Sequence, residues 1–131
     1  MQSLKKYTIL VVDDDETLRN AIAFDFKRKG FTVLVSESGA KAFELVKANK
    51  IDLVISDIRM PGGDGLSLLE QIRAYNPGIP AVIFVTGFAD TTEESCLAKG
   101  AKKVIAKPFD RKHLMTTVLE VLNISHDTAA Q

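Results

Sequence analysis

Short apolar runs alternate along the chain with longer segments in which apolar residues recur every three or four positions. The short runs are almost continuous in Val, Ile, Leu and Phe, a pattern typical of parallel strands that are covered on both faces. They predict five strands, which cover Thr8–Val12, Thr32–Ser36, Leu53–Ser56, Ala81–Thr86 and Lys103–Ala106.

Helical spacing fills the intervals between these runs and continues after the last one. We expect Gly30 and Gly100 to end the first and fourth helices, and Asp110 to cap the fifth. The helices are marked by Leu18, Ile22 and Phe26; by Ala42, Leu45 and Val46; by Leu66, Leu69 and Ile72; by the more polar segment from Asp90 to Lys99; and by Leu114, Val118, Val121 and Leu122.

A strand followed by a helix therefore occurs five times, with no internal sequence repeat. This order predicts one α/β domain over residues 1–124, a doubly wound (βα)5 flavodoxin-like sandwich. Its five-stranded parallel sheet has the expected strand order 2-1-3-4-5, and ligands bind such a sheet beyond the carboxyl ends of strands one and three. Residues 125–131 are polar and small, and predict a frayed tail or the start of a cut-off linker.

Composition narrows the class of partner. The 131 residues include 17 Lys and Arg and 17 Asp and Glu, so no net field draws the chain to nucleic acid or to a membrane. No apolar stretch approaches the roughly 18 residues that suggest a membrane span. Cys96 is the only cysteine, which excludes an internal disulfide framework and fits a reducing cytoplasm.

Three carboxylates, a hydroxyl and an ammonium group stand at the ends of the apolar runs. Asp13 and Asp14 follow the first run, Asp57 follows the third, Thr86 ends the fourth and Lys107 follows the fifth. The carboxyl ends of neighbouring parallel strands meet at one edge of the sheet, where close carboxylates would repel and raise one another's pKa. Mg²⁺ relieves this repulsion and suits one to three carboxylates with a substrate phosphate.

The same groups suit the transfer of a phosphoryl group. Asp57 would be both a metal ligand and the nucleophile, since a carboxylate can accept a phosphoryl group as an acyl phosphate. Lys107 would neutralise charge on the transferred group, and Thr86 would donate a hydrogen bond to one of its oxygens.

These motifs follow a known order. From about Thr8 to Leu122 the chain resembles the receiver (CheY-like) domain of two-component response regulators. Each motif alone is weakly specific, but together they identify the family with high specificity. They are Asp13-Asp14, Asp57-Ile58-Arg59-Met60-Pro61-Gly62, Asp64-Gly65, Thr86-Gly87 and Lys107-Pro108-Phe109.

The resemblance implies a set of roles. Asp13, Asp14, Asp57 and the backbone carbonyl of Arg59 would hold Mg²⁺. Asp57 would take its phosphoryl group from a phosphohistidine on a sensor histidine kinase or a phosphotransfer protein. The chain would be a signalling domain rather than an enzyme, although it assists its own phosphorylation and dephosphorylation.

The resemblance also implies a readout. Thr86 and Lys107 would sense the phosphate and repack the face made by the fourth helix, the fifth strand and the fifth helix. That face would address a downstream protein target or a fused output domain, and could form a phosphorylation-dependent dimer. Whether the chain is a complete single-domain regulator or the first domain of a longer protein stays open.

Two features depart from the family pattern. Val104 stands where relatives usually carry an aromatic switch residue, and Gly87 follows the switch hydroxyl in place of the commoner Ala. The Val104 substitution predicts less change in the fifth strand on activation. Arg59 and Phe88 occupy the positions that set water access to the acyl phosphate, and as a long cation and a ring they predict slow autodephosphorylation.

Two rival functions share parts of this pattern. Asp13-Asp14-Asp15-Glu16-Thr17 also fits the D-x-D-x-T signature of haloacid-dehalogenase-like phosphatases, with Asp13 as nucleophile and Asp15 as acid/base. That alternative leaves Asp57 unexplained, and after Lys107 it finds acids only on a helix or in the tail. A flavin-binding alternative lacks a Ser/Thr/Gly-rich phosphate loop after the first strand.

Overall fold

Five strands and five helices alternate along the chain in the computed structural model, which describes residues 4–60, 64–87 and 92–124. The strands are β1 (Thr8–Val12), β2 (Thr32–Ser36), β3 (Leu53–Ser56), β4 (Ala81–Thr86) and β5 (Lys103–Ala106). The helices are α1 (Glu16–Lys29), α2 (Gly39–Ala48), α3 (Gly65–Tyr75), α4 (Glu93–Ala98) and α5 (Arg111–Val121).

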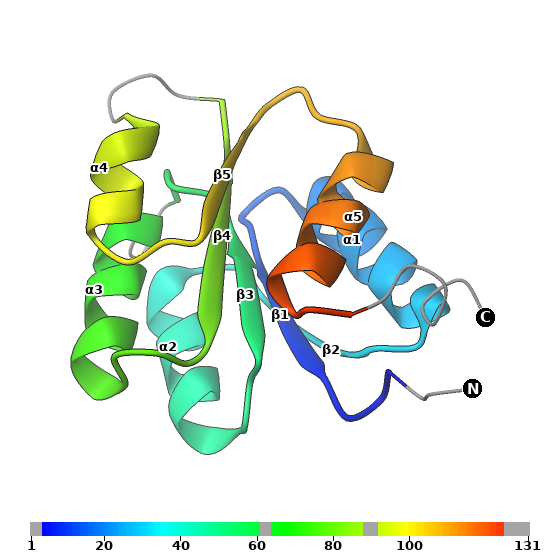
Figure 1. Ribbon diagram of the computed structural model, residues 1–131, viewed down its shortest axis with the longest axis horizontal. Coiled ribbons are helices and arrows are strands. Elements are labelled where there is room, and N and C mark those ends of the chain that lie inside the picture. Colours follow the sequence, from blue (N-terminus) through cyan, green and yellow to red (C-terminus); the bar gives the residue numbers. More distant parts are fainter. Residues whose placement is uncertain (1–3, 61–63, 88–91, 125–131) are drawn as a thin grey trace.

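The strands form one parallel sheet in the order β2-β1-β3-β4-β5, which confirms the predicted fold. The register pairs Val12 with both Ser36 and Ser56, and Thr86 with Ala106. Helices α1 and α5 cover one face of the sheet, and α2, α3 and α4 cover the other (Figure 1). The carboxyl ends of β1, β3, β4 and β5 therefore lie together along one edge.

Each face of the sheet has its own apolar core. Successive side chains of a strand point to opposite faces, so Val11 packs under α1 and α5 while Val12 packs under α2 and α3. Central strands are buried on both sides, and β3 is buried at all four positions. This burial explains why the strands show as continuous apolar runs in the sequence.

Each of the five described helices has a side-chain cap at its N-terminus. The N-caps of α1 to α5 are Asp15, Ser38, Asp64, Thr92 and Asp110, and each side chain accepts a hydrogen bond from a backbone N–H of the first turn. The expected Asp110 cap and the Gly30 stop are confirmed, because Gly30 has the left-handed φ of 117°. The prediction that the fourth helix runs from Asp90 was wrong at its start: Thr92 is the cap, and α4 begins at Glu93.

At the amino edge of the sheet, charged side chains form hydrogen bonds with main-chain groups of neighbouring strands and loops. Asp52 Oδ2 accepts from the backbone N–H of Thr8 at 2.8 Å. Arg73 donates to the carbonyl oxygens of Pro80, at 2.7 Å, and Gly100, at 3.4 Å. No helix in the described parts of the chain combines the length and the apolar character needed to cross a membrane.

Candidate phosphoacceptor and metal site

The carboxylates of Asp13, Asp14 and Asp57 meet at the carboxyl ends of the adjacent strands β1 and β3. One oxygen from each side chain lies within 4.8 Å of the other two. Asp13 and Asp57 are buried, with 1% and 5% of their surface exposed, and Asp14 is exposed. The cluster therefore has one side open to solvent.

Local hydrogen bonds fix the loop after β1. Asp13 Oδ1 accepts from the backbone N–H of Asp15 at 2.9 Å, and Arg19 Nη1 donates to the Asp13 carbonyl at 2.9 Å. Asp13 Oδ2 is buried and, within the described part of the chain, has no hydrogen-bond partner. Lys107 Nζ lies 3.6 Å from this oxygen, which is an ion-pair distance rather than a hydrogen bond.

Both oxygens of the Asp57 carboxylate are engaged. Oδ2 accepts from Lys107 Nζ at 2.8 Å, and Oδ1 accepts from the backbone N–H of Ile58 at 2.7 Å. The Lys107 backbone is fixed in turn, because its N–H donates to the Thr86 carbonyl at 2.8 Å. The ammonium group of Lys107, which follows β5, therefore lies directly against the Asp57 carboxylate at the end of β3.

Burial and neighbouring groups together shift the pKa values of Asp13 and Lys107. Burial raises the pKa of Asp13 above its ordinary value, and the carboxylates of Asp57 and Asp14 add to that rise. The Asp15 N–H and the Lys107 charge oppose it without cancelling it. For Lys107, burial disfavours the ammonium, but the hydrogen bond to Asp57 and the charge of Asp13 outweigh it and raise the pKa.

This cluster fits a hard divalent cation. Asp13 Oδ2 is a buried acceptor with no hydrogen-bond donor among the described residues, and buried polar atoms in folded proteins are rarely left in that state. Three carboxylate oxygens at this spacing match the ligand preference of Mg²⁺, which keeps several waters in addition. The structure brings these three predicted ligands together, and their binding of metal stays a prediction.

The remaining predicted site residues occupy different environments. Thr86 is buried at the end of β4, beside the strand that carries Asp57. Arg59 is exposed in the segment after β3, and Val104 is half-buried against the core beneath α2 and α3. Phe88, with Pro61 and Gly62 of the acceptor motif, lies outside the described residues. The roles of these residues stay predictions.

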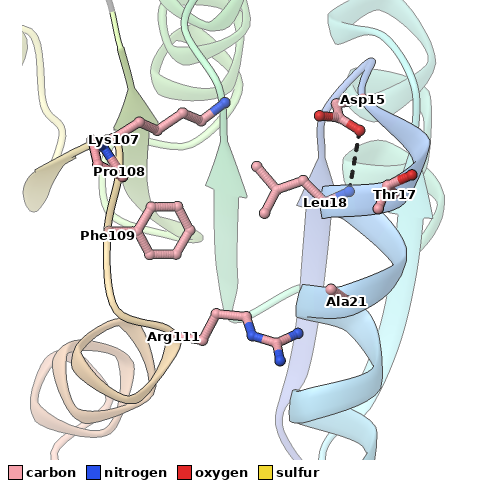
Figure 2. Close-up of a pocket in the computed structure, with 8 residues that line it drawn as sticks. All are labelled: Asp15, Thr17, Leu18, Ala21, Lys107, Pro108, Phe109 and Arg111. Atoms are coloured by element: carbon pink, nitrogen blue, oxygen red, sulfur yellow. Dashed lines mark hydrogen bonds between the residues drawn. The ribbon is translucent and has the colours of Figure 1, made fainter.

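A groove beside Lys107 was not predicted from the sequence. It has a volume of about 650 Å³ and runs between the start of α1 and the segment from Lys107 to the start of α5. Leu18 and Phe109 face each other across it, and Arg111 points from α5 towards α1 (Figure 2). Arg111 Nε also pairs with Asp25 Oδ2 of α1 at 3.3 Å. One wall of this groove is formed by the Lys107-Pro108-Phe109 motif, which is visible in the sequence although the groove itself is not.

Gly65 makes close packing behind Asp57 feasible. Its backbone N–H donates to the Ile58 carbonyl at 2.7 Å. A Cβ at this position would overlap the Asp57 carbonyl oxygen and would lie 2.8 Å from Phe84 Cε1. Only a glycine lets the first turn of α3 lie this close to the acceptor strand.

Comparison with known proteins identifies the family. The family model described as the response regulator receiver domain matches residues 9–119, which is most of the chain. The chain therefore belongs to the response regulator receiver domain family. This result confirms the resemblance inferred from the motifs.

The relatives are longer proteins of several kinds. The transcriptional regulatory protein ZraR of Escherichia coli K12 is 34% identical over 123 residues, which are 94% of this chain and 28% of that protein. The sensor kinase CckA of Brucella abortus is 36% identical over 118 residues, 88% of this chain and 12% of that protein. The chain thus spans less than a third of either relative.

Solved structures share the fold over nearly the whole chain. A CheY-like receiver domain protein from Methanospirillum hungatei JF-1 has a TM-score of 0.83 and 28% identity, and covers 89% of this chain and 94% of its own. The CheX-CheY-BeF3-Mg complex from Borrelia burgdorferi has a TM-score of 0.82 and 30% identity, with 88% and 89% coverage.

Proposed function

We propose that the chain is a phosphoacceptor of a two-component system, in which Asp57 takes a phosphoryl group from a phosphohistidine. A bond forms between an Asp57 carboxylate oxygen and phosphorus while the P–N bond to the imidazole breaks, and its electron pair stays on the nitrogen. The observation that carries this proposal is the buried Asp57 carboxylate, bonded to Lys107 and clustered with Asp13 and Asp14.

Each surrounding residue has a task in that transfer. Asp13, Asp14, Asp57 and the Arg59 carbonyl would hold Mg²⁺, which when bound neutralises charge on the phosphoryl oxygens. Lys107 would move its hydrogen bond from the carboxylate to a phosphoryl oxygen, and it stays charged because its pKa is raised. Thr86, at the end of β4, would donate a hydrogen bond from its hydroxyl to another of these oxygens.

The groove beside Lys107 supports the proposed partner. Lys107, which is bonded to Asp57, lines it, and its walls are mainly apolar groups of Leu18, Ala21, Pro108 and Phe109. A sensor histidine kinase or phosphotransfer protein that packs on these groups would bring its phosphohistidine to Asp57. Relatives named as transcriptional regulators support a fused output domain as the downstream target.

The readout would use the face formed by α4, β5 and α5. On activation Thr86 shifts towards the phosphate, and α4 moves with the loop that precedes it. Val104, half-buried and without an aromatic ring, would transmit little of this movement to β5. Backbone amide shifts on beryllofluoride binding should be larger around Thr86 than at Val104; equal shifts would contradict this part.

Phosphatase activity through Asp13 is the weaker alternative. It requires Asp15 to act as an acid and base, but Asp15 Oδ1 accepts the backbone N–H of Leu18 at 3.2 Å as the cap of α1. Asp13 Oδ1 is also occupied by the N–H of Asp15. One oxygen of each of these carboxylates therefore serves the local backbone, and the alternative gives no role to Asp57, which is bonded to Lys107.

Labelling with phosphoramidate tests the proposed function. Mass spectrometry should show one Mg²⁺-dependent acyl phosphate in the parent and none in Asp57→Asn. Asp110→Asn is the matched control, because Asn also caps helices and Asp110 lies at the start of α5. Normal labelling of Asp57→Asn together with loss of labelling in Asp13→Asn would favour the phosphatase.

Slow loss of the phosphate is a further part of the proposal. The exposed Arg59, together with Phe88, would cover the line along which water attacks. Arg59→Asn with Phe88→Glu should hydrolyse the acyl phosphate faster than the parent after the donor is removed. An unchanged or slower rate would contradict a shielded site.

A further inference from the structure

The peptide unit between Asp57 and Ile58 is held at both ends. Ser56 Oγ donates to the Asp57 carbonyl oxygen at 2.7 Å, and the Ser56 side chain is fully buried at the end of β3. At the other end of the same peptide, the Ile58 N–H donates to Asp57 Oδ1 at 2.7 Å. Gly65 packs against this carbonyl with no room for a side chain.

The orientation of this peptide controls the acceptor carboxylate. The peptide is planar, so its C=O and N–H rotate together. If the carbonyl turned away from Ser56, the Ile58 N–H would turn away from Oδ1. The carboxylate would then be held only through Oδ2, by Lys107 at 2.8 Å, and it could rotate about its side-chain bonds.

We propose that Ser56 is a positioning residue, which keeps the Asp57 carboxylate in its reactive orientation by fixing this peptide. The inference rests on the proposed function and adds a residue that acts on the transfer only through Asp57. Transfer of a phosphoryl group depends on the alignment of the attacking oxygen with the leaving group, so a freely rotating carboxylate reacts more slowly.

Ser36 provides a matched comparison. It is also the last residue of its strand, it is buried, and its hydroxyl donates to a backbone carbonyl, that of Ser38 at 2.9 Å. That bond shapes the turn into α2 and does not involve the acceptor peptide. The Ser36 hydroxyl also accepts from the Ser38 N–H at 3.3 Å, so its loss removes two part-buried hydrogen bonds, whereas loss of the Ser56 hydroxyl removes one buried bond. Only the Ser56 hydroxyl is bonded to the peptide that holds Asp57.

Phosphoramidate kinetics test this difference. Ser56→Ala should lower the rate constant at saturating donor about tenfold, while the half-saturating donor concentration stays the same. Ser36→Ala should stay within about twofold of the parent. Ser56→Thr keeps a hydroxyl and should recover most of the rate. A rate for Ser56→Ala equal to that for Ser36→Ala would overturn the proposal.

The Ile58 amide gives a readout that needs no phosphorylation. In ¹⁵N spectra, Ser56→Ala should move the Ile58 N–H signal upfield and speed its hydrogen exchange, and Ser36→Ala should do neither. An unchanged Ile58 signal in Ser56→Ala overturns the positioning role even if the phosphorylation rate of that variant falls. An unlabelled parent would contradict the proposed function, while the amide comparison would still decide the geometry.

Discussion

Charged side chains have different hydrogen-bonding environments at the two edges of the sheet. At the amino edge, Asp52 accepts a main-chain N–H, and Arg73 bridges the carbonyls that precede β4 and β5. At the carboxyl edge, Asp13 Oδ2 is buried and no described residue donates a hydrogen bond to it, and burial raises the pKa of the Asp13 carboxyl. The first arrangement ties the strand ends together, whereas in the second a single ammonium group, that of Lys107, faces the clustered carboxylates of Asp13, Asp14 and Asp57.

This difference indicates what each edge is for. Hydrogen bonds to charged groups stabilise a fold when both partners are satisfied, as at Arg73. An unsatisfied buried carboxylate costs stability and persists where a bound group completes it. This contrast supports the proposal that the carboxyl edge is the functional edge, and substitutions at the two edges should have distinguishable effects.

The largest effect is expected at Gly65. Gly65→Ala puts a methyl group onto the Asp57 carbonyl, and backbone atoms cannot move aside as a flexible side chain would. We expect the free energy of unfolding to fall by about 2–3 kcal/mol. Urea denaturation measures this value.

Gly78→Ala is the matched control for Gly65→Ala. A Cβ at Gly78 meets no atom within 4 Å, so its effect should stay within about 0.5 kcal/mol. Equal losses in the two variants would show that close packing against Asp57 does not set the cost.

A smaller loss is expected at the amino edge. Arg73→Met keeps much of the side-chain volume but removes the bonds to Pro80 and Gly100, which should cost about 1–2 kcal/mol. Labelling of Asp57 by phosphoramidate should be unaffected, because the change lies at the opposite edge. Arg28→Met, an exposed position near the end of α1, should cost less than half as much in the same denaturation experiment.

The smallest effect has the opposite sign. Without Mg²⁺, Asp13→Asn should stabilise the protein at neutral pH, because burial disfavours the charged Asp13 carboxylate more than its hydrogen bond and Lys107 favour it. Asp52→Asn is the control, and it should not stabilise, since Asp52 already has its hydrogen bond. Stabilisation by both changes would show a general effect of lost negative charge.

The pH dependence follows from the raised pKa of Asp13. The folded protein holds this proton more tightly than the unfolded chain, whose carboxyl has the ordinary pKa of 3.8. The Asp13 contribution to stability therefore falls as the pH rises from about 3.8 to the folded pKa, and then stays constant. In EDTA, the stability of the parent relative to Asp13→Asn should decrease over that range; an increase would contradict the pKa direction.

The sequence was sufficient to predict the parts of the fold that depend on the pattern of apolar and polar residues. Residues such as Val54 and Ile55 are buried on both sides of β3, so the strand showed as a continuous apolar run. Ligands bind parallel sheets beyond the carboxyl ends of the strands, so the positions of Asp13 and Asp57 after their strands were enough to predict that they lie close together. The predicted start of α4 was wrong, because Thr92 caps the helix. This segment is polar, and the spacing of its few apolar residues was too weak to show where the helix begins.

The parts that depend on side-chain direction could not be predicted. Ser56 and Ser36 look alike in sequence, and only the structure shows which hydroxyl bonds to the acceptor peptide. Leu18 belongs to an ordinary apolar helical stripe, yet it faces Phe109 across the groove (Figure 2). The missing partner of Asp13 Oδ2 likewise depends on distances that a residue pattern does not contain.

Thermal unfolding of the parent and Asp13→Asn, with and without Mg²⁺, tests the central claim most directly. A ligand that binds only the folded state raises its stability, and Asp13 is one of the three proposed carboxylate ligands of Mg²⁺. The order of the two melting temperatures should therefore reverse, with the variant higher in EDTA and the parent higher at saturating Mg²⁺. A parent that melts higher in both conditions, or Mg²⁺ that raises the two proteins equally, would contradict the account.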